Sequence, residues 1–106
     1  MIEEGGRETI QQILSGNEDA FREIIEEYAR PLFNYSRRMT NNISDAEDIT
    51  QETFIRFWES RSQFDPKRVK VTTWLHRIAH NLCVDQFRRR EREARNSVSL
   101  LEASIS

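Results

Sequence analysis

Residues 71–95 carry an apolar period that suits an α-helix and then change abruptly to dense positive charge. In VTTWLHRIAHNLCVDQF, apolar side chains recur at intervals of three and four residues, so they form one stripe of a helix that packs against a core. After Phe87 the sequence RRREREAR has a single apolar residue, so this part of the helix must face solvent or a negatively charged partner. The stripe comprises Leu75, Ile78, Ala79 and Leu82.

A second face of the same helix combines an aromatic ring, an amide and guanidinium groups. Its members recur every three or four residues beside the apolar stripe. A strand of nucleic acid is bound by such a combination, because bases stack on rings and phosphates pair with guanidinium groups. The face therefore indicates nucleic-acid binding. Its residues are Trp74, Arg77, Asn81, Asp85 and Arg88.

The composition supports one small helical domain. A chain of 106 residues holds a single core, and only three Gly and two Pro leave little room for a many-turned β fold. The single Cys83 cannot form an internal disulfide, and no leader or long apolar run is apparent, so a cytoplasmic chain is expected. Residues 1–60 hold 6 Lys and Arg against 13 Asp and Glu, whereas residues 61–106 hold 10 against 5. This division predicts two partners of opposite charge.

Two further helices are predicted before residue 61. Asn17 is a suitable N-cap for the first helix, whose apolar period continues to Thr40. Pro31 lies inside this helix and is expected to kink or break it, because proline removes a backbone hydrogen bond. The second helix is predicted to begin with a capping box made by Ser44 and Glu47 and to extend to about residue 60.

The second of these helices has two distinct faces. Its buried face is predicted to hold Ala46, Ile49, Thr53 and Phe57. Acidic and amide groups surround apolar groups on the opposite face, an arrangement typical of a docking surface for a basic partner. The alternative is that its aromatic rings cover the preceding helix and the acids form a solvated face. This opposite face comprises Glu47, Asp48, Gln51, Ile55 and Trp58, flanked by Glu52 and Phe54.

The remaining segments are connections. Asp65 and Pro66 predict a turn that leads into the helix over residues 71–95. The serine-rich segment over residues 96–106 predicts a flexible linker stub. The expected fold is therefore all-α, a compact bundle of three to four helices over residues 1–95 with a flexible C-terminal tail over residues 96–106.

Four segments resemble region 2 of bacterial sigma factors of the extracytoplasmic-function (ECF, group 4) class within the sigma-70 family. They are SGNEDAFREIIEEYARPLF, SDAEDITQETFIRFW, FDP and TTWLHRIAHNLCVDQFRRR, which together cover residues 15–92 in one register. The resemblance implies a helical transcription initiation domain with no enzymatic activity. Its implied partners are the clamp helices of the RNA polymerase β′ subunit, the non-template strand of the −10 promoter element, which it recognises and melts, and an anti-sigma factor. Region 4, which reads the −35 element in this family, is expected to be absent, as in an excised domain or a naturally split factor.

The resemblance assigns two sets of binding residues. The polymerase-binding set comprises Glu47, Asp48, Gln51, Glu52, Phe54 and Trp58. The DNA-binding set comprises Trp74, Arg77, Asn81, Arg88 and Arg89, together with Lys67, Arg68 and Lys70 of the loop that shapes a pocket for a base turned out of the stack. Phe64 and Asp85 are expected to support this set rather than to read DNA.

Roles within the DNA-binding set are open. Trp74 either braces the loop from the core or stacks on a base. Asp85 would repel phosphate, so it is expected to orient Asn81 or to pair with an arginine. Phe64 is expected to fill the core beneath the loop, and residues 88–90 are expected to contact phosphate rather than bases.

Two other classes of function compete with this interpretation. His76, His80 and Cys83 have the i, i+4, i+7 spacing that zinc could use, but the sequence shows no obvious fourth ligand and no H-E-x-x-H glutamate. No metal or cofactor is therefore expected. The alternative function is a helical protein-interaction module whose acidic helix docks a basic partner without DNA binding, which leaves the face with Arg77 and Asn81 unexplained.

Overall fold

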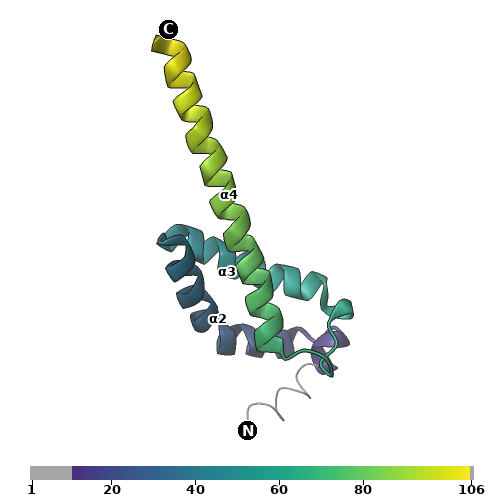
Figure 1. The fold of residues 1–106 in the computed structure, drawn as a ribbon. Helices are drawn as coiled ribbons and strands as arrows, with labels where there is room; N and C mark the ends of the chain where they lie inside the picture. Colours follow the sequence, from purple (N-terminus) through teal and green to yellow (C-terminus); the bar gives the residue numbers. More distant parts are fainter. Residues whose placement is uncertain (1–10, 106) are drawn as a thin grey trace.

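The computed structural model describes residues 11–105. Residues 11–14 form a helical turn, and the remaining elements are α2 (Glu18–Thr40), α3 (Ile43–Glu59), the 3₁₀ helix η1 (Arg61–Gln63) and α4 (Val71–Ile105). No strand occurs between residues 11 and 105. α4 crosses α3, and α2 packs against both of them (Figure 1). The predicted all-α bundle is confirmed.

α2 begins where the sequence indicated. The Asn17 side-chain oxygen accepts a hydrogen bond from the backbone N–H of Ala20 at 3.1 Å, and acidic residues follow in the first turn, where the helix dipole favours them. The helix continues through Pro31 without interruption, so the predicted break does not occur. It is nevertheless bent along its length (Figure 1), as expected for a helix with an internal proline.

The start of α3 differs from the prediction. Asn41 ends α2 in the left-handed conformation, with φ of 53°, and Asn42 then takes an extended conformation. This short connection brings the Asn42 side-chain oxygen to the backbone N–H of Asp45, at 2.9 Å. Asn42 is therefore the N-cap, and Ser44 lies inside the first turn. The predicted capping box of Ser44 with Glu47 is wrong.

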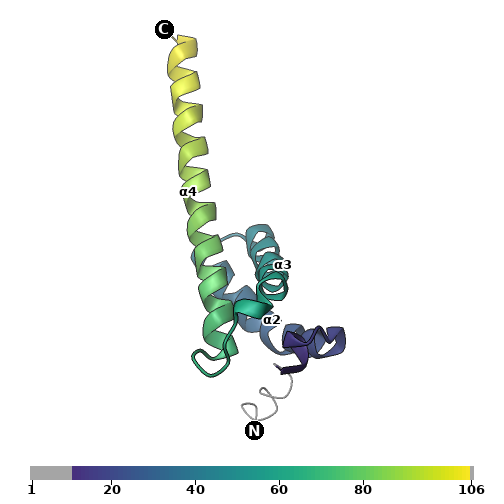
Figure 2. The same cartoon turned by 90° about the vertical axis from the view of Figure 1, so that its right-hand side faces the viewer.

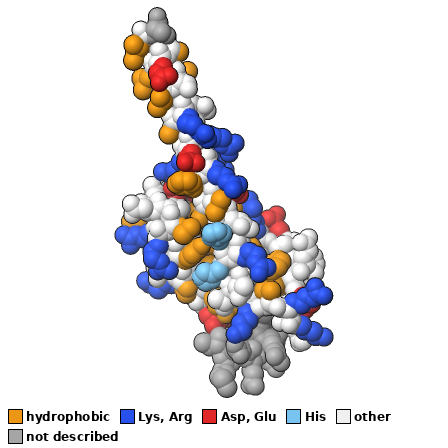
Figure 3. Space-filling model, viewed as in Figure 1, with side chains coloured by type: hydrophobic (Ala, Val, Ile, Leu, Met, Phe, Trp, Pro, Cys, Tyr) orange, Lys and Arg blue, Asp and Glu red, His pale blue; other side chains and the backbone are white. Residues whose placement is uncertain are grey.

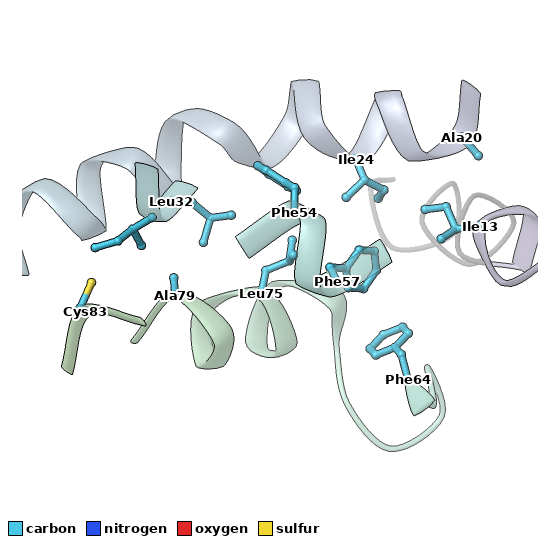
Figure 4. Packing of buried hydrophobic residues seen from close by; sticks show 11 residues of the cluster. Ile13, Ala20, Ile24, Leu32, Phe54, Phe57, Phe64, Leu75, Ala79 and Cys83 are labelled. Carbon is cyan, nitrogen blue, oxygen red and sulfur yellow. The ribbon is translucent and has the colours of Figure 1, made fainter. Parts of the chain in front are cut away.

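The core lies where the three long helices meet (Figure 4). Phe57 of α3 is fully buried at its centre, with its ring centroid 6.4 Å from that of Phe21 and 5.8 Å from that of Phe64. Burying a side chain of this size contributes about 1.5–3 kcal/mol to folding. All four residues predicted for the buried face of α3 are buried. The apolar core comprises Ile13, Ala20, Ile24, Leu32, Ile49, Phe54, Phe57, Phe64, Leu75, Ala79 and Cys83.

α4 is the longest helix between residues 11 and 105, and its first half packs against α2 and α3. Leu75 and Ala79 of its first half are completely buried, whereas every residue from Phe87 to Ile105 is exposed. The helix projects far beyond the bundle (Figure 2), and the molecule measures 64 × 23 × 22 Å. Residues 96–105 continue this helix, so the structure does not show the flexible tail that was predicted there. The segment contains no Gly or Pro, and its Leu, Glu and Ala residues favour a helix despite the serines.

Candidate protein and nucleic-acid interfaces

The exposed side of α3 is acidic. Glu47, Asp48 and Gln51 all face solvent, and Ile55 beside them is 51% exposed. Within residues 11–105, Glu47 and Asp48 take part in no ion pair, so both carboxylates are available to a partner. The partly exposed Glu52 accepts a hydrogen bond from Nε of Arg56 at 3.2 Å. The surface therefore offers carboxylates, an amide and one aliphatic group to a cationic partner.

The two aromatic residues predicted for this surface lie at different depths. Phe54 is 5% exposed and belongs to the core, so it supports α3 from beneath and leaves no ring for a partner to contact. Trp58 is half-buried, with its ring centroid 4.8 Å from that of Phe21. The guanidinium of Arg61 lies 4.0 Å from the centroid of the Trp58 ring, and its Nη1 donates to the Trp58 carbonyl at 2.8 Å. Trp58 is thus a fixed ring at the end of the acidic face.

The loop between η1 and α4 is held by one buried ring. Phe64 is 4% exposed and packs against Phe57, which is the supporting position that the sequence predicted. Asp65 stabilises the turn, because its carboxylate accepts from the backbone N–H of Lys67 at 3.0 Å and lies 3.8 Å from Nε of Arg68. The loop therefore presents a charged, exposed outer side on a fixed base. Its exposed cationic residues are Lys67, Arg68 and Lys70.

Trp74 joins this loop to the predicted DNA-binding face of α4. Its half-buried ring lies 5.7 Å from that of Phe64, and its enclosed Nε1 donates no hydrogen bond to any residue between 11 and 105. The guanidinium of Arg77 lies 6.0 Å from the centroid of the Trp74 ring. This contact with Phe64 places the Trp74 ring where it can brace the loop, which is one of the two roles that the sequence left open. Arg77 and Asn81 are exposed one turn apart beside it, where they are accessible to a nucleic acid.

Further along α4, the charged residues divide into free and paired groups. Arg88 and Arg89 are exposed, as a phosphate-binding role requires. Asp85 is also exposed, and it forms no hydrogen bond or ion pair with any residue between 11 and 105, so its predicted pairing is not observed. Arg90 instead pairs with Asp45 in the first turn of α3. The sequence carried no signal for this contact, because it depends on how α4 crosses α3.

The charge of the surface follows this arrangement. Viewed with α4 in front, the molecule shows more Lys and Arg side chains than acidic ones (Figure 3). The basic residues continue from the bundle onto the projecting part of α4 (Figure 3). A surface of this kind attracts polyanions.

The possible zinc ligands are not assembled. Nδ1 of His80 lies 2.8 Å from the Tyr35 hydroxyl, while Nδ1 of His76 lies 2.9 Å from the Thr72 carbonyl oxygen. Cys83 is buried, and burial raises the pKa of its thiol, which disfavours the thiolate that a metal needs. Within the part of the chain that the structure describes, no three metal-ligating side chains cluster. The bond between Tyr35 and His80 was not predicted, since no local spacing relates two residues on different helices.

The length of α4 also raises the question of a membrane. The helix has 35 residues, but neither it nor any other helix between residues 11 and 105 is both long enough and apolar enough to cross a bilayer.

The fold and these surfaces together define a small helical domain with an exposed acidic face on one helix and an exposed cationic, amide-bearing face on the next. Residues 24–93 match the Sigma-70 region 2 family, and the chain belongs to this family. Its relatives identify it as a region 2 domain of the ECF class.

Three relatives illustrate the similarity. The chain is 40% identical over 85 residues to the ECF RNA polymerase sigma factor SigW of Bacillus subtilis, an alignment that covers 80% of this chain and 45% of that protein. It is 43% identical over 67 residues to the ECF RNA polymerase sigma factor SigG of Mycobacterium tuberculosis, covering 63% of this chain and 18% of that protein. It is 33% identical over 86 residues to the RNA polymerase sigma factor CnrH of Cupriavidus metallidurans, covering 81% of this chain and 44% of that protein. The chain spans less than half the length of these relatives.

Proposed function

We propose that this chain is the part of a transcription initiation factor that docks on RNA polymerase through α3 and captures the −10 promoter element through α4. The observation that carries the proposal is the presence of two exposed surfaces of opposite charge on adjoining helices of one core. Glu47 and Asp48 mark the acidic surface, and Arg77 and Asn81 mark the other. The relatives, whose names describe RNA polymerase sigma factors, support it. The domain acts as a non-enzymatic factor in the cytoplasm with the polymerase.

The polymerase-binding surface is the exposed side of α3. Its carboxylates steer the clamp helices of the β′ subunit, which in this proposal present a basic surface. Trp58 supplies a rigid ring at one end, because its contacts with Phe21 and Arg61 already fix its position. Phe54 contributes from the core by holding α3 in place. The proposed contact residues are Glu47, Asp48, Gln51, Glu52 and Trp58.

The strand-capturing surface lies at the first half of α4. Capture of a base breaks no covalent bond, and it costs a few kcal/mol of lost stacking, which contacts of about 1–3 kcal/mol per base offset. The Asn81 amide both donates and accepts hydrogen bonds, so it can bind the edge of a base. Arg77 lies beside it and can donate hydrogen bonds to a phosphate or to a base. Cationic side chains on either side of these two residues position the sugar-phosphate backbone of the DNA strand by pairing with its phosphates. They are Lys67, Arg68 and Lys70 on the loop, and Arg88 and Arg89 further along α4.

Two further partners complete the proposal. A domain that reads the −35 element acts together with this one at the promoter, from the same polypeptide or from another. An anti-sigma factor holds the domain inactive by covering the acidic side of α3, because a protein bound there excludes the polymerase.

A crosswise pair of variants tests the proposal. Asn81→Ala removes the amide and should weaken binding of a single-stranded −10 oligonucleotide about tenfold, the equivalent of about 1.4 kcal/mol, without affecting capture by isolated β′ clamp helices. Asp48→Lys reverses one charge of the acidic surface and should abolish clamp-helix capture without affecting the oligonucleotide. Fluorescence anisotropy measures the first activity, a pull-down measures the second, and circular dichroism confirms that both variants fold.

The opposite results have definite meanings. If both variants lose both activities while they remain folded, the two surfaces are misassigned. If the unsubstituted chain binds clamp helices but no oligonucleotide, the protein-interaction module is the better description of its function.

A further inference from the structure

The projecting part of α4 carries exposed apolar side chains at the spacing of a coiled coil. Phe87, Val98, Leu101 and Ile105 are between 53% and 85% exposed. Positions 87, 91, 94, 98, 101 and 105 alternate intervals of four and three residues, which is the heptad repeat through which two helices pack. Only position 91 in this series is polar. We call Phe87, Ala94, Val98, Leu101 and Ile105 the apolar seam.

The bundle does not cover the seam. Cys83, about one turn before Phe87, is buried, so the seam continues the bundle-facing side of α4 beyond the point where the bundle ends. Hydrophobic side chains are visible along the projecting helix (Figure 3). A contiguous exposed apolar surface marks an interaction site, and a helix gains most of its stability when such a face packs against a partner. The seam therefore indicates that a second helix packs here.

Two charged residues beside the seam identify that helix as α4 of another copy. Glu102 follows Arg88 by 14 residues, or two heptads, so the two lie on the same flank near opposite ends of the seam. When two copies lie antiparallel, with Phe87 beside Ile105 of the partner subunit, each Arg88 lies beside the partner subunit's Glu102. Neither Arg88 nor Glu102 forms an ion pair with a residue between 11 and 105, so both are available. The antiparallel pair therefore gains two attractive contacts between opposite charges.

Shape and charge both disfavour the parallel arrangement. Packed helices lie about 8–10 Å apart, whereas the molecule is 22–23 Å across. Because the seam is on the bundle-facing side of α4, two parallel copies would place their bundles in the same space, and antiparallel copies place them at opposite ends. A parallel pair would also bring Arg90 of each copy towards Arg95 of the partner subunit, which is repulsive.

We infer that α4 forms an antiparallel coiled coil with α4 of a second copy of this chain, through the apolar seam. The seam is about 28 Å long, at 1.5 Å per residue, and has fewer than three heptads, so the dimer is weak and reversible. Glu91 inside the seam lowers its stability further but fixes its register, as a single polar core position does in other coiled coils. Arg95 also lowers it, because it meets its own counterpart at the centre. The inference does not depend on the proposed function, since neither DNA nor polymerase takes part.

Analytical ultracentrifugation of the full chain without DNA tests the inference. The unsubstituted chain should pass from monomer to dimer as its concentration rises from micromolar to millimolar. Its helix content, measured by circular dichroism, should rise over the same range, because packing stabilises the projecting helix. Leu101→Asp buries an unpaired charge in the seam, beside Glu91 of the partner subunit, and should raise the dissociation constant of the dimer about tenfold or more.

The neighbouring leucine provides a matched control. Leu100 is 70% exposed and lies on the other side of the helix. Leu100→Asp removes the same apolar group and adds the same charge, but it should leave the dissociation constant unchanged. Equal effects of the two substitutions would overturn the inference. A chain that remains monomeric at millimolar concentration would also overturn it and would leave the seam to a different protein.

A charge exchange tests the direction of the two helices. Glu102→Arg places like charges beside each other in the antiparallel pair and should weaken the dimer several-fold. Arg88→Glu, added to Glu102→Arg, restores opposite charges and should return the dissociation constant to that of the unsubstituted chain. If the double variant is as weak as Glu102→Arg alone, the antiparallel arrangement is wrong.

Discussion

Cys83 shows how a buried residue links the packing of this domain to pH. Its side chain is 3% exposed on α4 and lies beside the Ser36 hydroxyl of α2. Burial raises the pKa of the Cys83 thiol, and the Ser36 hydroxyl opposes part of that rise. The folded state therefore holds this proton more tightly than the unfolded chain does. Stability from this source is complete below the ordinary thiol pKa of about 8.5 and is lost as pH rises through the folded value.

The first prediction at this scale follows from that sign. The free energy of unfolding of the unsubstituted chain, measured by urea denaturation between pH 7 and pH 10, should fall above about pH 8.5. In Cys83→Ser the side chain cannot lose a proton in this range, so the decline should be smaller. Tyr35 should contribute to the decline that remains, because burial also raises the pKa of its hydroxyl. Identical declines in the two proteins would show that the thiol keeps its ordinary pKa after folding.

The residues of the candidate site were predicted unevenly, for physical reasons. Phe64 was expected to fill the core beneath the loop, and it does, because a large ring next to a turn has few other places to pack. Phe54 was assigned to the exposed face, but it is buried. It lies at the boundary between the two faces of α3, and only the packing of the neighbouring helices decides on which side such a ring falls. The pairing of Arg90 with Asp45 joins two helices and has no local pattern.

At the scale of the element, the helices themselves were predictable and their ends were less so. Apolar periodicity located all three long helices, because each must bury one stripe against the others. The N-cap of α3 was misplaced, because Ser44 with a glutamate three residues later resembles a capping box, whereas Asn42, two residues earlier, is the residue that accepts from the Asp45 N–H. The end of α4 was also missed, because serine content suggested a linker although the segment lacks Gly and Pro.

The revised cap gives the second prediction, which compares Asn42→Ala with Ser44→Ala. Asn42→Ala removes the acceptor for the Asp45 N–H and should lower the free energy of unfolding by about 1 kcal/mol. Ser44→Ala changes a solvent-facing side chain within the first turn and should shift it by less than about 0.5 kcal/mol. Urea denaturation at pH 7 measures both. A larger loss for Ser44→Ala than for Asn42→Ala would restore the capping box that the sequence suggested.

At the scale of the whole molecule, one core holds two exposed surfaces that are opposite in charge. α3 contributes its buried face to the core and its acidic face to solvent, while α4 contributes its apolar stripe to the core and its basic side to solvent. Arg90 connects the two helices at the point where α4 leaves the bundle, so the direction of the projecting helix is tied to the start of α3. Because the surfaces lie on different helices, two partners should bind without competing.

Simultaneous binding of both partners by one molecule is the most direct test of the proposed function. The dissociation constant of the chain for a labelled single-stranded −10 oligonucleotide is measured by fluorescence anisotropy, first alone and then with β′ clamp helices at saturating concentration. If the two surfaces bind different partners, a ternary complex should form, in which the clamp helices leave the affinity for the oligonucleotide unchanged or increase it. Displacement of the oligonucleotide by the clamp helices would show that the two partners share one surface and would contradict the proposed function.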